Sequence, residues 1–172
     1  MTENREDLEE AVLDLLCRSM KYNLVFTGLG GENREENTER KLREFIFHEL
    51  GIEGHIEFVN VHRFGRYVSE KCRPIVARFV YNKDRDDVLA STYKLKGKPF
   101  GVHEQFPKEV EDRRRQLYPI VKDLKKSGNS NVKLVRDKLY VNGKLYDPKE
   151  RKMECDTVIQ PVTAVADQQI RR

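Results

Sequence analysis

The chain has 172 residues, is 38% hydrophobic and 36% charged, and carries a formal net charge of +4. That length fits one ordinary domain or two small ones, and no apolar run approaches the roughly 20 residues of a membrane-spanning helix, so no membrane contact is expected. Three cysteines lie far apart in the sequence, which argues against a disulfide framework or a thiolate zinc site and favours a reducing compartment, cytoplasmic or nuclear.

The N-terminal segment, residues 1–21, is predicted to be a helix. Leu8, Val12, Leu15 and Ser19 recur at three- and four-residue spacing, which places them on one side of that helix. The stripe is too short for an independent coiled coil. We interpret it as the stub of a longer one.

Residues 22–107 are predicted to form an α+β domain. The expected strands span residues 22–29, 56–61, 74–81 and 100–106, and the expected helices span 38–50 and 83–95. The order is strand, helix, strand, strand, helix, strand. This is the split β-α-β unit of ferredoxin-like folds, which RNA-recognition motifs also use.

A small α-β-β-β domain is expected over residues 108–148. Its helix spans 108–126 and contains Pro119, which removes a backbone hydrogen bond and predicts a kink. Short strands follow at 132–135, 138–141 and 144–146, and Asn142-Gly143 between the last two is a strong signal for a tight hairpin. Residues 149–172 lose all periodicity and are expected to form a mobile tail.

Charge is distributed unevenly along the chain. Residues 1–61 hold 7 Lys/Arg and 14 Asp/Glu, a net charge of −7, whereas residues 62–151 hold 23 and 12, a net charge of +11. A segment this basic attracts polyanions and speeds their association. Nucleic acid is therefore the first partner to consider, with a solvated basic surface as the alternative.

The predicted sheet lacks aromatic side chains where RNA-recognition motifs stack bases. Strand alternation places Val25 and Val76 at the outward stacking positions. We therefore expect weak stacking on the sheet and binding through phosphates, or through aromatic residues elsewhere, such as Tyr67, Tyr118 or Tyr140.

Two groups of cations are candidates for phosphate contacts. The first group surrounds the connection between the second and third strands and comprises Arg63, Arg66, Lys71 and Arg73, with Arg78 facing outward on the third strand. Gly65 would let a ligand approach the backbone closely there, although a solvated loop explains the pattern equally well. The second group is the run Arg113, Arg114 and Arg115, whose mutual repulsion favours a nucleic-acid role over partial neutralisation by acids one turn earlier.

No pattern points to catalysis, a cofactor or a metal. Gly28-Leu29-Gly30-Gly31 imitates a dinucleotide-binding loop, but the third glycine of that fingerprint is missing and the acids that follow would repel a pyrophosphate. The four histidines show no metal-ligand spacing, and no Ser/His/Asp or Cys/His group has an activating context. We expect a protein that is not an enzyme.

An ordered set of motifs runs from Asn23 to Asp147. Its members are Asn23 through Gly28, Val61-His62-Arg63 with Gly65-Arg66, Arg73 through Phe79, Gly97-Lys98-Pro99, Arg114-Arg115, Pro119-Ile120 and Leu124-Lys125. Together these residues resemble the RNA-binding protein encoded by the first reading frame of LINE-class retrotransposons, and host domains derived from it.

The resemblance implies a fold, a function and site residues. The fold is an RNA-recognition-like domain followed by a small C-terminal domain, behind a long coiled coil that makes a homotrimer. The function is coating of single-stranded RNA as a cytoplasmic ribonucleoprotein, with nucleic-acid chaperone activity. Phosphate-contacting roles transfer to Arg63, Arg66, Arg73, Arg114 and Arg115, and Lys138 and Tyr140 are further transfers.

Our sequence-based hypothesis is a sequence-tolerant binder of single-stranded RNA that also holds single-stranded DNA. The two arginine groups would line a basic trough between the domains, and counterion release would supply most of the affinity. The alternative is a protein-interaction module with an RNA-recognition-like fold, whose sheet is covered by a partner or by the chain's own tail, with Val25 and Val76 making the apolar contact. A nuclease is a third hypothesis, but no carboxylate cluster is placed for a metal.

Overall fold

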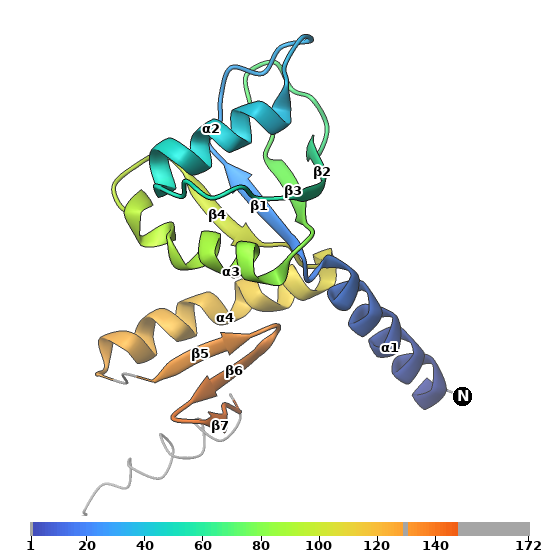
Figure 1. Ribbon diagram of the computed structural model, residues 1–172. Helices are drawn as coiled ribbons and strands as arrows, with labels where there is room; N and C mark the ends of the chain where they lie inside the picture. Colours follow the sequence, from blue (N-terminus) through green and yellow to red (C-terminus); the bar gives the residue numbers. More distant parts are fainter. Residues whose placement is uncertain (1, 129–130, 148–172) are drawn as a thin grey trace, which may run out of the picture. The chain divides into compact units, whose positions relative to one another are not determined.

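The structure, a computed structural model, describes residues 2–128 and 131–147 (Figure 1). It divides into a first unit, Met1–Glu111, and a second unit, Asp112–Arg172. The fold is mixed α+β, with a helix at the N-terminus and two antiparallel sheets. The predicted tail over 149–172 lies outside the described residues.

The predicted N-terminal helix is confirmed as α1 (Thr2–Met20). Its residues Leu8, Val12 and Leu15 are 65%, 47% and 66% exposed, and Leu13, on another side of the helix, is buried. The predicted apolar stripe therefore faces solvent.

After α1, the first unit contains a four-stranded sheet and the α-helices α2 and α3, in the predicted order along the chain. The elements are β1 (Asn23–Thr27), α2 (Thr38–Leu50), β2 (Phe58–Arg63), β3 (Ile75–Phe79), α3 (Asn82–Ala90), the short 3₁₀ helix η1 (Thr92–Leu95) and β4 (Gly101–Glu104). The strands pair antiparallel in the order β2-β3-β1-β4, and α2 and α3 cover one face of the sheet (Figure 1).

Capping residues determine where helix α2 begins and ends. The side chain of Asn37 accepts a hydrogen bond from the backbone N–H of Arg40, which caps the N-terminus. Gly51 adopts a left-handed conformation with φ of 66°, which terminates the helix. Its buried residues Leu42, Phe45, Ile46 and Leu50 fall on one face at helical spacing.

The predicted helix over 83–95 is wrong at its C-terminal end, because α3 stops at Ala90. The hydroxyl of Ser91 donates to the Asp87 carbonyl at 2.9 Å, and that of Thr92 donates to the Leu89 carbonyl at 2.7 Å. These bonds satisfy the last carbonyls of α3 and let the chain continue as a 3₁₀ turn.

The core lies between the sheet and the two helices. Phe26, Ile75, Ala77 and Phe79 alternate inward along β1 and β3 as predicted, and each is at most 1% exposed. Phe26 packs edge-to-face on Phe45 at a centroid distance of 6.0 Å.

On the face of the first sheet that α2 and α3 do not cover, the structure differs from the prediction at Val76. Register places His62, Val76, Val25 and His103 side by side across the four strands. Val25 is half-buried and Val76 is only 3% exposed, although it lies outside the core cluster. The expectation that Val76 is open to a partner is therefore wrong. This removes one of the two side chains on which the protein-interaction alternative depended.

The second unit combines the helix α4 (Lys108–Lys126), which begins in the first unit, with strands β5 (Val132–Val135), β6 (Lys138–Val141) and β7 (Lys144–Leu145). The strands pair antiparallel in chain order, and α4 continues through Pro119. Asn142 and Gly143 have φ values of 52° and 81°, which form the tight hairpin turn predicted from the sequence.

No helix in residues 2–128 and 131–147 combines the length and the hydropathy needed to cross a bilayer. Over the same residues, no three His, Cys, Asp or Glu side chains gather as a metal site would require.

Candidate nucleic-acid interface

Two loops of opposite charge meet at one end of the first sheet. The acidic loop between β1 and α2 supplies Glu32 and Glu36, and the basic loop between β2 and β3 lies beside it (Figure 1). Two arginines at the base of the basic loop, Arg63 and Arg73, pair with these acids. We call these four residues the clamp.

The side chain of Arg63 is almost completely buried, and its guanidinium donates hydrogen bonds within the chain. Its Nε and Nη2 atoms donate to the two carboxylate oxygens of Glu36, each at 2.8 Å, and the two side chains are 4% and 5% exposed. Its Nη1 atom donates to the carbonyls of Leu29 and Arg73, each at 2.7 Å. This bidentate geometry is the strongest arrangement that an arginine and a carboxylate can form.

Arg73 makes the second pair of the clamp. Its Nε atom donates to Oε1 of Glu32 at 2.9 Å, its Nη2 atom contacts the same oxygen, and its Nη1 atom donates to the Gly65 carbonyl at 3.1 Å. The Gly65 contact ties the guanidinium directly to the basic loop. Both ends of that loop are therefore held against the acidic loop.

The clamp shifts the pKa values of its members in the directions that keep them charged. The hydrogen bond from Arg63 lowers the pKa of Glu36 to about 2, with Lys41 adding to the effect. The hydrogen bond to Glu36 raises the pKa of Arg63, and the hydrogen bond from Arg73 lowers the pKa of Glu32. At neutral pH both pairs are fully ionised.

The clamp changes the roles expected for Arg63 and Arg73. A phosphate could reach Arg63 only by displacing Glu36 or backbone carbonyls, and Arg73 is already neutralised by Glu32. We therefore assign both arginines to anchoring the loop. A phosphate-contacting role for Arg63 stays a prediction that its burial does not support.

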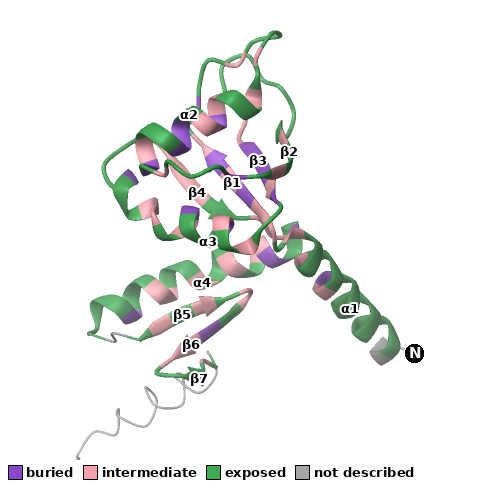
Figure 2. Cartoon of the chain, in the orientation of Figure 1, coloured by how far each residue is buried: buried purple, intermediate pink, exposed green. Residues whose placement is uncertain are grey.

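The middle of the basic loop, residues 64–72, is exposed throughout (Figure 2). The side chains of Arg66 and Lys71 make no hydrogen bond or ion pair with any part of the chain that the structure describes. Phe64 and Tyr67 are 50% and 60% exposed between these cations. The backbone N–H of Lys71 donates to the Val68 carbonyl at 3.0 Å, which forms a turn within this segment. We call Phe64, Arg66, Tyr67 and Lys71 the loop tip.

Arg78 lies on β3 and is half-buried. Its Nη1 atom donates to the Ser19 carbonyl, at the end of α1, at a distance of 3.1 Å. A carbonyl does not neutralise the guanidinium, so Arg78 places a positive charge on the face of the first sheet that α2 and α3 do not cover.

The three consecutive arginines of the second unit, Arg113 to Arg115, all contact other groups of the chain, but to different extents. Arg113 pairs with Asp137 at 2.7 Å, where the carboxylate is only 7% exposed, and Arg114 donates to the Arg136 carbonyl. Arg115 pairs with Asp112 at 3.2 Å, but its side chain is 75% exposed. An exposed pair of this kind contributes little energy, so Arg115 remains available to a phosphate.

One face of the second sheet combines cations with an aromatic ring. Lys133 pairs with Tyr140 across β5 and β6, and Val135 pairs with Lys138 on the same face. Lys133, Val135 and Lys138 are exposed and Tyr140 is half-buried. A hollow of about 290 Å³ is lined by Lys133, Val135 and Tyr140, among others. Lys138 and Tyr140, which the sequence resemblance selected, therefore lie next to each other on one accessible face.

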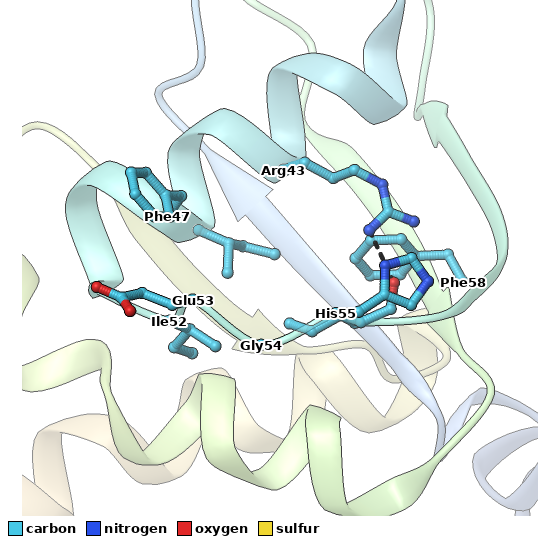
Figure 3. Close-up of a pocket in the computed structure, with 9 residues that line it drawn as sticks. Arg43, Phe47, Ile52, Glu53, Gly54, His55 and Phe58 are labelled. Atoms are coloured by element: carbon cyan, nitrogen blue, oxygen red, sulfur yellow. Dashed lines mark hydrogen bonds between the residues drawn. The ribbon is translucent and has the colours of Figure 1, made fainter.

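A second hollow, of about 250 Å³, lies between α2 and the segment that precedes β2 (Figure 3). The guanidinium of Arg43 closes one end, donating to the Ile56 carbonyl at 2.8 Å and lying 4.9 Å from the Phe58 ring. Phe47 and Ile52 supply apolar walls, and Glu53 adds a carboxylate. This lining does not suit a phosphate backbone.

Sequence reasoning missed part of this arrangement. Glu32 and Glu36 counted only as charges that repel a pyrophosphate, and Phe64 was not singled out. The signal that could have found the loop tip is the alternation of rings and cations in Arg63-Phe64-Gly65-Arg66-Tyr67.

A comparison of the chain with protein-family models gives no match, and a search of the curated proteins gives none either. The function of this chain is therefore inferred from its own residues and their geometry.

Proposed function

We propose that this chain is a non-enzymatic, sequence-tolerant binder of single-stranded RNA that also accepts single-stranded DNA. The observation that carries the proposal is the loop tip, where two cations without partners among the described residues alternate with two exposed rings. Cations for the phosphates and rings for the bases are the two components of single-strand binding.

Further support comes from the fold and from the second unit. The strand order β2-β3-β1-β4 with two helices on one face is the arrangement expected of an RNA-recognition-like domain. The second unit adds Arg115 and the face that carries Lys133, Lys138 and Tyr140. With the resemblance to LINE-class proteins, this supports a ribonucleoprotein coat with nucleic-acid chaperone activity in retrotransposition.

The proposal is tested by fluorescence anisotropy with a labelled single-stranded RNA between 50 and 200 mM salt. Binding through several phosphates predicts a steep fall in affinity over that range, because each neutralised phosphate releases counterions. A flat salt response would contradict the proposal. RNA incubated with the protein and magnesium should stay intact, and cleavage would instead favour a nuclease.

Replacing both loop-tip cations, as Arg66→Ala with Lys71→Ala, is expected to weaken binding to every sequence alike. The plot of log affinity against log salt should become shallower by about 1.4, which is about 0.7 for each lost single-strand phosphate contact. The matched control is Lys83→Ala with Lys96→Ala, which removes the same charge from exposed positions of the first unit. Equal slopes for the two double variants would show that the loop tip makes no phosphate contacts.

A further inference from the structure

The loop tip presents its rings from a fixed base. The backbone N–H of Phe64 donates to the Pro74 carbonyl at 2.8 Å, directly beside the clamp. The guanidinium of Arg73 lies 5.8 Å from the centroid of the Tyr67 ring, and that guanidinium is itself held by Glu32. Both rings are thus attached to a part of the loop that buried or half-buried ion pairs hold in place.

The rings are also accessible. Tyr67 remains 60% exposed despite its contact with Arg73, and Phe64 is 50% exposed. Holding such rings before the ligand arrives reduces the ordering cost of binding. Every nucleobase has a flat π face, so stacking on these rings would be tolerant of sequence.

We infer that Phe64 and Tyr67 form a base-stacking subsite for unpaired nucleotides, with Arg66 and Lys71 on the neighbouring phosphates and with Glu32 and Glu36 as positioning residues. This inference rests on the proposed function and adds to it the contacts to the bases. The stacking that the sheet lacks, because Val25 and Val76 occupy its stacking positions, is supplied by the loop.

An anionic lipid surface is the competing ligand, because exposed rings beside cations also bind membrane interfaces. Nucleic acid is favoured because Val68 is the one exposed aliphatic side chain among residues 64–72, so the loop tip offers little aliphatic area for insertion. The two ligands respond differently to leucine, which inserts into a bilayer but has no ring on which to stack a base.

The decisive variant is therefore Phe64→Leu with Tyr67→Leu. Its control is Phe47→Leu with Tyr93→Leu, which removes two rings that are 50% and 73% exposed elsewhere in the first unit. Affinity for single-stranded RNA should fall at least about fivefold in the loop variant, at an unchanged salt slope, and should stay within about twofold in the control.

A second arm compares a single-stranded DNA with an abasic strand of the same length and charge. The wild-type protein should prefer the strand with bases by at least about fivefold, and the loop variant should bind both strands about equally. Equal binding of both strands by the wild-type protein would overturn the inference, as would an unchanged affinity in the loop variant.

The remaining outcomes distinguish a failure of the stacking subsite from a failure of the proposed function. Steep salt dependence without any effect of the loop variant would overturn the stacking subsite and leave the proposed function standing. No salt-dependent binding of RNA by the wild-type protein would overturn both. Binding to phosphatidylserine vesicles that the loop variant retains, together with no preference for bases, would assign the loop to a lipid surface.

Discussion

Replacing Glu36 by glutamine is expected to lower the free energy of unfolding by about 3 kcal/mol, because the change leaves the buried guanidinium of Arg63 without its counter-charge. The loss should fall at the lower end of the range for broken buried pairs, since Arg63 keeps two carbonyl acceptors. Urea denaturation followed by circular dichroism measures the difference. The matched control is Glu35→Gln, an exposed neighbour with the same change of charge, for which we expect a change within about 0.5 kcal/mol.

The pH dependence provides an independent measure of the same interaction. Because the pKa of Glu36 falls from 4.5 to about 2 in the folded protein, its stabilising effect is complete above pH 4.5 and disappears as the pH falls to about 2. The difference in stability between the wild-type protein and Glu36→Gln should therefore shrink between pH 5 and pH 3. A constant difference over that interval would contradict the ionised pair.

The same variant separates charge from positioning in RNA binding. Removing a carboxylate from a polyanion-binding protein should tighten binding if only net charge matters. We expect Glu36→Gln to weaken it, because the loop tip loses its anchor, while Glu35→Gln tightens it slightly. Hydrogen exchange over residues 64–72 should increase in Glu36→Gln even without RNA. If both variants bind more tightly, the clamp does not position the loop.

Replacing Gly28 by alanine is the second change with a large expected effect. A Cβ atom there would lie 2.1 Å from the carbonyl oxygen of Pro99, a backbone atom that cannot turn aside, and the φ of Gly28 is +89°. Overpacking and backbone strain together predict a loss of about 3 kcal/mol or more. Gly28 begins the loop that carries Glu32 and Glu36, so RNA affinity should fall as well.

The control for this change lies two residues away. A Cβ atom at Gly30 would have nothing within 4 Å, and Gly30 has no positive φ. Gly30→Ala should therefore be neutral or slightly stabilising, because it reduces the entropy of the unfolded chain. Thermal and urea denaturation of both variants test the contrast, and similar losses at the two glycines would show that the close approach to Pro99 is not what costs stability.

Local order was predictable where signals act over a few residues. Helix α2 follows from Asn37 at its start, Gly51 at its end and apolar residues at helical spacing between them. The core-facing residues of β1 and β3 follow from alternation along each strand, although Val76 between them is buried as well. The end of α3 was missed because it depends on where two hydroxyls donate, at Ser91 and Thr92, and composition alone does not specify that.

Three features could be predicted from the sequence alone: the chain is basic after residue 61, its elements come in this order, and a turn rich in arginine follows β2. Which of the cations in that turn have no partner among residues 2–128 and 131–147 depends on the three-dimensional fold. Arg63 and Arg73 meet acids 27 and 41 residues earlier in the chain, while Arg66 and Lys71 extend beyond the reach of those acids. Periodicity and capping act between neighbours in sequence, whereas charge neutralisation depends on which loops the fold brings together.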